Sequence, residues 1–416
     1  MKIRSITYFD NLLWPLDGSR LQGAKGFIIP ARETFQDGGY EVQTTRLATP
    51  PFPQVLGSQM NKEAVQYAKE LEGHLIADGF DFVSIGPALP EFPASYSILP
   101  EILENTQNVF GAGIISSGRR GIVFTAIKAC AAAVKRIAGI SADGFDNLRF
   151  AALANVPPGS PFLPAAYHQD PRKPAFAIAT EAADLAVEAI SQASSLEDAR
   201  SKLIQSIETQ AAALSNLGRE LAEQYGIVFG GIDFSLAPFP RSEQSIGTAI
   251  EGLGVPALGD HGSLAAVAFL AEALDQAQYQ RTGFSGVMLP VMEDTVLARR
   301  ALEGNLAIND LLLYSAVCGT GLDTIPLPGE VSEEQLHAIL LDLAALAQRL
   351  GKPLTARLMP IPGKLEGDPI EFDFEYFANS RVMELKSQPL TGLMAGDEEY
   401  KINSRKDIQG RLEITE

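Results

Sequence analysis

The sequence predicts an α/β protein built around a largely parallel sheet. Strand-like runs alternate with amphipathic helical segments almost from end to end, and this order requires crossover connections between parallel strands. With 416 residues, 46% of them hydrophobic, the chain can bury a large core. No change of composition marks a domain boundary, so we expect a single domain over residues 1–416. The pattern alone is compatible with both an open sheet and a closed barrel.

The first expected element is a strand at 3–9, where polar and apolar residues alternate. A second strand follows at 40–47, and apolar side chains recur at helical spacing over 62–78. The remaining strands of the first half are expected at 82–85, 109–115 and 148–154. Its other helices are expected at 98–108, 121–138 and 176–193.

The second half opens with a long helix, or a bent pair of helices, at 196–225. Three strands are expected, at 227–235, 286–291 and 354–360. The helices between them are expected at 263–274, 294–303, 308–317 and 331–350. The segment SAVCGTGLDTIPLPGE, residues 315–330, is interpreted as a helix exit followed by a turn with paired prolines.

The charge distribution disfavours nucleic acid as a partner. The chain carries 33 basic and 51 acidic residues, a net charge of −18, and the basic residues are scattered. No stretch approaches the roughly 20 uninterrupted apolar residues of a membrane span, and the amino terminus lacks the pattern of a signal peptide. We therefore expect a cytoplasmic protein whose two cysteines, Cys130 and Cys318, are free thiols.

Polar residues that follow expected strands are the first candidates for a site, because ligands of parallel sheets bind at the carboxyl ends of strands. Asp233 and Ser235 lie on the same side of the strand in FGGIDFSLAPFP. A structural role would also explain Asp233: its carboxylate could cap a loop or pair with an arginine. In LGDHGS, a helix cap explains Asp260 but leaves His261 unexplained.

Two further candidates lie in loops. His168, in PFLPAAYHQD, is the second choice among four histidines. Glu293 follows the expected strand GVMLPV, where the dipole of the next helix alone would favour an acidic residue.

Ser117, Arg119 and Arg120 follow the expected strand VFGAGII and precede an expected helix. Guanidinium groups and free N–H groups at a helix start can hold a phosphate or carboxylate, although two solvated arginines in a turn fit equally well. The chain contains no CxxC, HExxH, GxSxG or GxGxxG fingerprint in a supporting context. This excludes zinc held by clustered cysteines and leaves open a hard divalent ion held by carboxylates and a histidine.

Cys318 is placed at the exit of the expected helix 308–317. A thiol there could be a nucleophile or a small buried hydrophobe. The negative end of a helix dipole raises the pKa of a thiol, which disfavours an unassisted thiolate.

The sequence resembles a widespread prokaryotic family, the domain-of-unknown-function family 711. The resemblance covers residues 111–372 and is carried by SSGRRGIVFTA, LANVPPGSPFLPAAYHQ, GIDFSLAP, GDHGSLAAVAFL, FSGVMLPVMED, CGTGLDTIPLPGE and RLMPIPGKLEGDPIEF. Members of the family look like distant relatives of pyruvate formate-lyase and anaerobic ribonucleotide reductase. The resemblance therefore implies a ten-stranded α/β barrel with a cysteine on a central loop. Residues 1–110 are the most divergent part, where we expect substrate selection to lie.

Carried onto this chain, the family's motif positions are Cys318, Gly321, Asp323, Asp233, Ser235, His261, Glu293, Asp294 and His168. Among them, Cys318, Asp233 and His261 are the catalytic candidates. The candidate substrate-binding residues are Ser117, Arg119, Arg120, His168, Ser235, Glu293 and Asp323. We expect the three catalytic candidates to meet in one central cavity, with Cys318 as nucleophile or proton donor and His261 or Asp233 as acid or base. The expected ligand is a small anionic metabolite, and a homo-oligomer is left open.

Two other functions remain open: a non-catalytic binding or regulatory protein, and a metal-dependent hydrolase that uses Asp233, His261 and Glu293. A glycyl radical is not expected. Glycyl-radical enzymes store the radical in an Arg-Val-x-Gly motif near the carboxyl terminus, and the nearest match here is RVME, residues 381–384. Glu384 occupies the position of the glycine, and its Cβ would crowd a planar radical.

Overall fold

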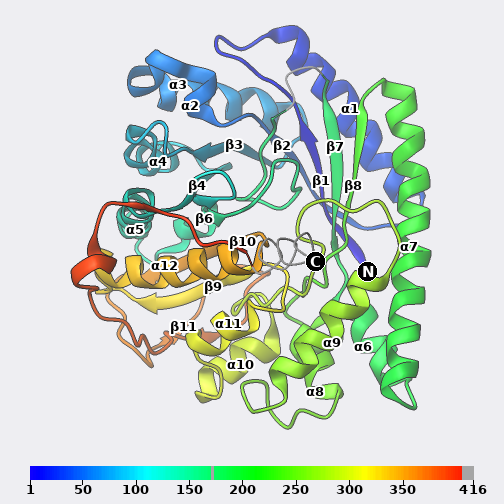
Figure 1. The fold of residues 1–416 in the computed structure, drawn as a ribbon. Helices are drawn as coiled ribbons and strands as arrows, with labels where there is room; N and C mark the ends of the chain where they lie inside the picture. Colours follow the sequence, from blue (N-terminus) through cyan, green and yellow to red (C-terminus); the bar gives the residue numbers. More distant parts are fainter. Residues whose placement is uncertain (170–172, 405–416) are drawn as a thin grey trace, which may run out of the picture.

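The computed structural model describes residues 1–169 and 173–404, and in them one large sheet runs through the molecule (Figure 1). Its strands follow the order β8-β7-β1-β2-β3-β4-β6-β10-β9. They are β1 (Lys2–Phe9), β2 (Val42–Ala48), β3 (Phe82–Ala88), β4 (Val109–Ser117), β6 (Phe150–Ala154), β7 (Ala175–Glu181), β8 (Val228–Asp233), β9 (Gly321–Pro328) and β10 (Leu354–Ile361). The fold is thus a mixed α/β domain with a mostly parallel sheet, as expected in its coarse form.

The strand directions divide the sheet into parts. Strands β1, β2, β3, β4 and β6 are mutually parallel. The parallel pair β7–β8 joins β1 in antiparallel fashion, and the parallel pair β9–β10 joins β6 in the same way. The two outer pairs therefore run opposite to the five central strands.

The two ends of this sheet both touch the segment 286–291. Val287 forms a parallel bridge with Leu236, just after β8, and Pro290 forms one with Asp323 of β9. The backbone of Gly286 lies against Gly319, and a Cβ on Gly286 would come within 2.3 Å of the Cα of Gly319. The strand expected at 286–291 is therefore a pair of isolated bridges, because only single residues on each side come into register.

Helices cover the outer, convex side of the sheet (Figure 1). The longest, α7, flanks the sheet next to α1, and α3, α4, α5 and α12 cover its other part. The helices are α1 (Gly18–Asp37), α2 (Phe52–Leu56), α3 (Met60–Ala77), α4 (Ala94–Glu104), α5 (Phe124–Ala138), α6 (Ala183–Ser191), α7 (Leu196–Tyr225), α8 (Ile246–Gly252), α9 (Ser263–Gln276), α10 (Thr295–Glu303), α11 (Ile308–Tyr314) and α12 (Glu333–Leu350). None of the helices in the described part of the chain is both long and apolar enough to cross a membrane.

A loop, residues 156–168, lies against the inner, concave side of the sheet; we call it the inner loop. The carbonyl of Pro161 accepts hydrogen bonds from the hydroxyls of Ser5 and Thr7, at 3.1 and 2.8 Å. The carbonyl of Ala166 accepts one from Ser84 at 2.6 Å. Strand hydroxyls therefore satisfy carbonyls that burial would otherwise leave without partners.

The apolar side chains of the inner loop contact strands in several directions. Leu163 packs in one buried cluster with Phe9, Ala48, Phe110 and Ala177. Phe162 packs with Ala179, Ala237 and Met288, and Ala165 with Ala112, Ala151 and Leu153. One loop thus contacts β1, β2, β4, β6 and β7 at once, so the sheet is curved around it.

Several elements differ from the sequence prediction. The helix expected at 176–193 is strand β7 followed by α6, because a short run without a polar face is also the pattern of a strand buried on both sides. Helix α1 was not expected. The sequence predicts a turn with paired prolines at Pro326 and Pro328, but this segment forms strand β9. Among the described residues β9 has a regular ladder only with β10, and prolines are tolerated on an edge strand.

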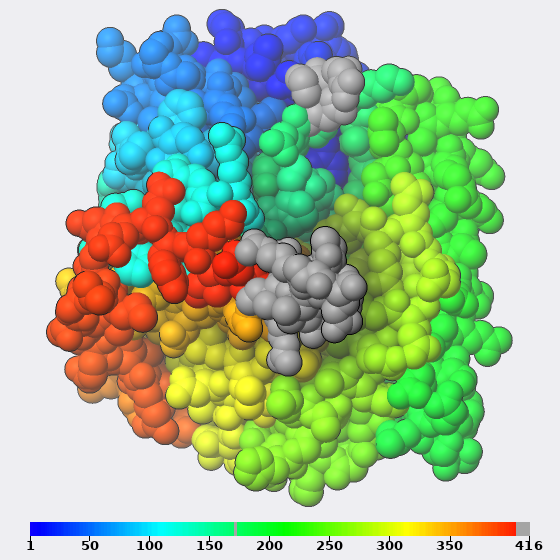
Figure 2. Space-filling model, viewed as in Figure 1, coloured from blue at the N-terminus to red at the C-terminus, as the bar shows by residue number. Residues whose placement is uncertain are grey.

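The carboxyl-terminal segment returns to the first half of the chain. Strand β13 (Glu399–Tyr400) pairs with β5 (Gly121–Val123), a short strand that also pairs with the end of β4. Figure 2 shows the last described residues, in red, lying over the cyan part of the surface. The helix expected at 121–138 accordingly begins only at Phe124, after β5.

Truncation of Leu163 to alanine should destabilise the protein, because this side chain fills the interior between four strands. We expect a loss of about 2–4 kcal/mol in the free energy of unfolding, measured by urea denaturation. Leu393→Ala is the control, since Leu393 is 86% exposed and its truncation should change stability by less than about 0.5 kcal/mol. Equal effects of the two substitutions would contradict the assignment of the inner loop to the core.

Candidate functional site

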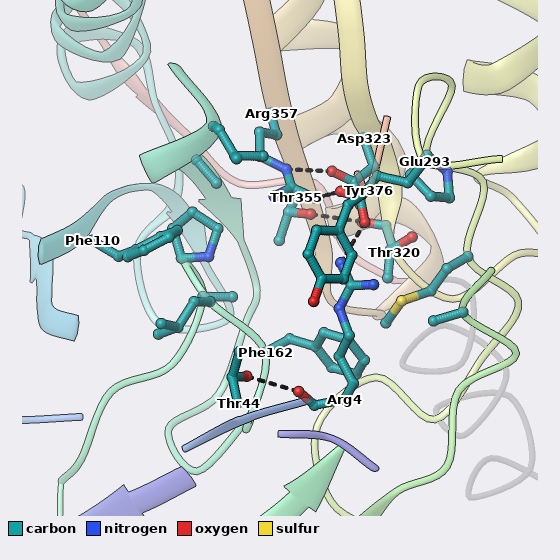
Figure 3. Close-up of a pocket in the computed structure, with 18 of the residues that line it drawn as sticks. Arg4, Thr44, Phe110, Phe162, Glu293, Thr320, Asp323, Thr355, Arg357 and Tyr376 are labelled. Carbon is teal, nitrogen blue, oxygen red and sulfur yellow. Dashed lines mark hydrogen bonds and ion pairs between the residues drawn. The ribbon is translucent and has the colours of Figure 1, made fainter. Parts of the chain in front are cut away.

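A cavity of 170 Å³ lies on the concave side of the sheet, above the inner loop. Strands β1, β2, β3, β4, β6, β9 and β10 contribute to its walls, and residues 374–376 cover it. Figure 3 shows these side chains converging from strands that are far apart in the sequence. Three arginines, Arg4, Arg46 and Arg357, lie in its wall.

Glu293 connects two of these arginines. Its carboxylate accepts a short hydrogen bond from Arg4 and another, of 2.8 Å, from Nη2 of Arg357. Nε of Arg357 also donates to Asp323 at 2.6 Å, and Arg4 donates to Glu181 at 3.2 Å. The result is a continuous chain of ion pairs, from Glu181 to Asp323, along one wall of the cavity.

Arg46 is the exception in this network. It is 7% exposed, and its Nε donates to the hydroxyl of Thr44 at 2.9 Å. Within residues 1–169 and 173–404, no carboxylate forms an ion pair with its guanidinium. Burial, with the positive charges of Arg4 and Arg357, lowers the pKa of Arg46 to about 9. The group is still a cation at neutral pH, and a bound anion would stabilise it.

The two carboxyl groups beside Arg357 have opposite pKa shifts. Burial raises the pKa of Asp323, and the negative charge of Glu293 raises it further, against the opposing effect of Arg357. Burial would also raise the pKa of Glu293, but Arg4, Arg357 and Arg46 together outweigh it and lower that pKa. Paired groups whose environments push their pKa values apart are suited to serve as acid and base.

Two further polar groups face the cavity. Thr320 is 3% exposed, and within the described residues its hydroxyl has no hydrogen-bond partner. The guanidinium of Arg4 lies 5.5 Å from the ring centroid of Tyr376, which covers it in Figure 3. A ligand in the cavity could therefore contact a hydroxyl and a phenol in addition to Arg46.

The three arginines were not among the residues expected from the sequence. Each lies inside a strand: in KIRSITYF, VQTTRLA and LTARLMPI. The residues expected from the sequence follow strands, whereas the three arginines of this cavity lie within strands. A charged residue in the middle of an apolar strand is the signal that could have identified them, because burial of such a charge requires a partner or a cavity.

The structure does not bring Cys318, Asp233 and His261 together, and none of them lines the cavity. Cys318 is 2% exposed within the apolar core, and its carbonyl accepts a short hydrogen bond from Lys352. His261 is exposed in the turn before α9. The common central site expected for these three residues has no counterpart in the geometry, because each is held by a different part of the fold.

The contacts of Asp233 are those of a residue that stabilises a turn. Its carboxylate accepts hydrogen bonds from the backbone N–H groups of Phe284 and Ser285, at 2.6 and 2.7 Å, and from the hydroxyl of Ser235 at 2.6 Å. Asp233 and Ser235 therefore hold the turn that leads into the segment 286–291. Complete burial raises the pKa of Asp233 to about 6.

Of the expected substrate-binding residues, Glu293 and Asp323 line the cavity. The others lie elsewhere. The backbone N–H of His168 donates to the carbonyl of Thr49 at 2.9 Å, at the end of the inner loop. Among residues 1–169 and 173–404, no three histidine, cysteine, aspartate or glutamate side chains gather in the manner of a metal site.

Ser117, Arg119 and Arg120 line a separate hollow of 270 Å³. There Arg120 pairs with Glu91 and Glu399. The segment is a hairpin between β4 and β5, so the helix start that was expected to supply N–H groups to an anion is absent from this turn.

This chain belongs to the family described as "Uncharacterised ACR (DUF711)", whose pattern it matches over residues 1–380. It is 34% identical over 346 residues to a UPF0210 protein of Pyrobaculum islandicum, a match that covers 79% of this chain and 76% of the relative. A UPF0210 protein of Acetivibrio thermocellus is 30% identical over 371 residues, with 84% and 80% covered. A UPF0210 protein of Neisseria gonorrhoeae is 28% identical over 362 residues, with the same coverage.

Substitution of Asp233 by asparagine should change how stability depends on pH. The folded-state pKa, near 6, is above the ordinary value of 3.8, so this carboxyl group favours the folded state below pH 4 and loses that contribution as pH rises through 6. The stability of the wild type relative to Asp233→Asn should therefore fall by about 2.5 kcal/mol between pH 4 and pH 7.

Chemical denaturation across this pH range measures the difference. Asp37→Asn is the matched control for the substitution itself, because Asp37 is exposed at the end of α1. A difference that increases with pH would show that the hydrogen bonds to Asp233 outweigh its burial.

Proposed function

We propose that this protein is an enzyme that binds a small anionic metabolite in the central cavity. Arg46 carries the proposal: it is a buried cation in the cavity wall without a carboxylate partner among the described residues. Such a charge is costly unless it is paired, and a ligand anion would supply the missing partner. Arg46 belongs to residues 1–110, the part of the chain where substrate selection was expected.

Asp323 and Glu293 are the groups suited to proton transfer. Asp323, with its raised pKa, acts as general acid toward the bound metabolite, while Glu293 stays ionised and positions Arg357 and Arg4. Both carboxyl groups contact the guanidinium of Arg357, so a change of charge on one alters the pKa of the other. The reaction class is a two-electron reaction with proton transfer.

The chemistry proceeds without a glycyl radical. Glu384 stands where the radical motif has glycine, and the inner loop, residues 156–168, contains no cysteine that could relay a radical. Aerobically purified protein should accordingly be active. Anaerobic treatment with a radical-activating enzyme and S-adenosylmethionine should produce no glycyl doublet in paramagnetic resonance.

We also propose that the sheet closes into a barrel of ten strands, similar to the fold of pyruvate formate-lyase, with the segment 286–291 as the tenth. Two observations support this. The segment forms parallel bridges to both ends of the sheet, and the paired glycines Gly286 and Gly319 allow close approach of the two backbones. Closure would place five parallel strands opposite five others and enclose the inner loop.

Arg46→Gln should abolish ligand retention. We expect wild-type protein, purified without added ligand and then denatured, to release a small anion detectable by mass spectrometry. The Arg46→Gln variant should release at least about tenfold less, because a charge-assisted contact is lost. Arg219→Gln, an exposed substitution on α7, should release as much as the wild type. Equal release from Arg46→Gln would refute the proposed anion site.

Asp323→Asn should separate catalysis from binding. If the released metabolite is returned to fresh protein, proton NMR should detect its conversion by the wild type. The variant should convert it about 10²–10⁴-fold more slowly, because a positioned general acid contributes this much. Conversion by neither protein, with binding intact, would instead indicate a non-catalytic binding protein.

A further inference from the structure

We propose that the ligand of the cavity is a small monocarboxylate with a compact apolar body, bound with its carboxylate on Arg46 and its apolar part against β3, β4 and the inner loop. This inference rests on the proposed function, since it specifies the anion that the cavity takes.

The walls of the cavity differ in polarity along the order of the strands. Starting at Arg46 on β2, the next strands contribute Phe82 from β3 and Phe110 from β4, and β6 adds Ala151. Ion pairs lie on both sides of this stretch: Arg357 and Asp323 beyond β6, on β10 and β9, and Arg4 on β1, next to β2. Figure 3 shows Phe110 on the side of the cavity away from Asp323 and Glu293. The apolar wall is therefore continuous from β3 to β6, between Arg46 and Arg357.

The apolar wall begins next to the unpaired guanidinium. Arg46 and Phe82 are register partners in neighbouring strands, and the rings of Phe82 and Phe110 lie 5.2 Å apart in an edge-to-face arrangement. The inner loop adds Phe162 and Leu163 to the same side of the cavity. If the carboxylate of a ligand binds Arg46, the rest of the ligand would contact this apolar surface, where burial of a hydrocarbon group is favourable.

The charges of the cavity favour an anion of charge −1. Arg4 and Arg357 share Glu181, Glu293 and Asp323 between them, which leaves Arg46 as the guanidinium without an ion pair. The three guanidinium groups thus face three carboxylates, and their charges balance when all six groups are ionised. A monoanion that is taken up together with one proton, onto Asp323 in the cavity wall, keeps this balance. A dianion would leave a negative charge that no group of the described wall matches, at a high cost in a buried site.

The size of the cavity limits the body of the ligand. Its 170 Å³ is below the roughly 300–1,000 Å³ typical of sites for drug-sized ligands. Nucleotides and coenzyme-bound acids are therefore too large to be enclosed, and a single ring or a short branched chain fits better.

The experiment compares five probes with the full-length protein by isothermal titration calorimetry, after denaturation and refolding to remove any retained metabolite. Benzoate is the apolar monocarboxylate, acetate lacks the apolar body, benzamide lacks the charge, and succinate and phenyl phosphate carry a second charge. Benzoate should bind at least about tenfold more tightly than each of the other four, because it alone matches both the charge and the apolar wall.

Two variants locate the two ends of the probe. Arg46→Gln should weaken benzoate binding by about tenfold or more, and Arg46→Lys, which keeps the charge, should weaken it less. Phe110→Leu should weaken benzoate but leave acetate unchanged, since acetate does not reach β4. Arg219→Gln is the control and should bind all probes as the wild type does. Circular dichroism confirms that each variant is folded.

The outcomes distinguish failure of the monocarboxylate inference from failure of the proposed anion-binding function. If succinate or phenyl phosphate binds as tightly as benzoate and depends on Arg46, the cavity is an anion site and only the monocarboxylate inference is wrong. If Phe110→Leu binds benzoate as the wild type does, the orientation is wrong. If no anion binds the folded wild type and none is released on denaturation, both the inference and the proposed function are refuted.

Discussion

The inner loop, residues 156–168, is the constraint on which the rest of the structure depends. A loop buried inside a protein brings backbone carbonyls into a region without water, where each needs a donor. Here the donors are hydroxyls on the concave side of the sheet, including Ser5, Thr7 and Ser84. The sheet must curve to bring these strands around one loop, and the curvature in turn brings the two ends of the sheet to the same segment, 286–291.

The same loop determines where the cavity can be. Because Phe162, Leu163 and Ala165 fill part of the interior, the remaining space lies above them, between Arg46 and Arg357. The loop thus forms an apolar floor, and the ion pairs lie beside it, among Glu293 and side chains of β1, β7, β9 and β10. Glu293 accepts hydrogen bonds from Arg4 and Arg357 and so compensates their charges, whereas Arg46 has no such partner among the described residues. The cavity therefore has an apolar side, formed by the inner loop, and a charged side, formed by the ion pairs.

Much of the architecture was predictable from the sequence, since the alternation of strands and helices indicates a parallel sheet by local pattern alone. The errors have local causes. Residues 176–181 and 321–328 form strands whose patterns are ambiguous, one because it is wholly apolar and the other because it contains two prolines. Glu293 and Asp323, which line the cavity, were among the candidates drawn from the sequence, whereas the three arginines beside them were not. Their significance depends on which strands become neighbours, and no periodicity within a strand contains that information.

The position of β1 has a consequence for how the protein is made. This strand leaves the ribosome before the other strands of the sheet, yet it lies between β2 and β7, and its Arg4 pairs with Glu293, 289 residues later in the chain. At roughly 5–20 residues per second, translation takes roughly 15–60 s to deliver that partner. During this interval the nascent amino-terminal half contains an arginine-bearing strand with neither its second neighbour in the sheet nor its counter-charge. The native arrangement around the cavity is therefore a late event in synthesis, and the early strands remain dependent on protection from association with other chains until the second half arrives.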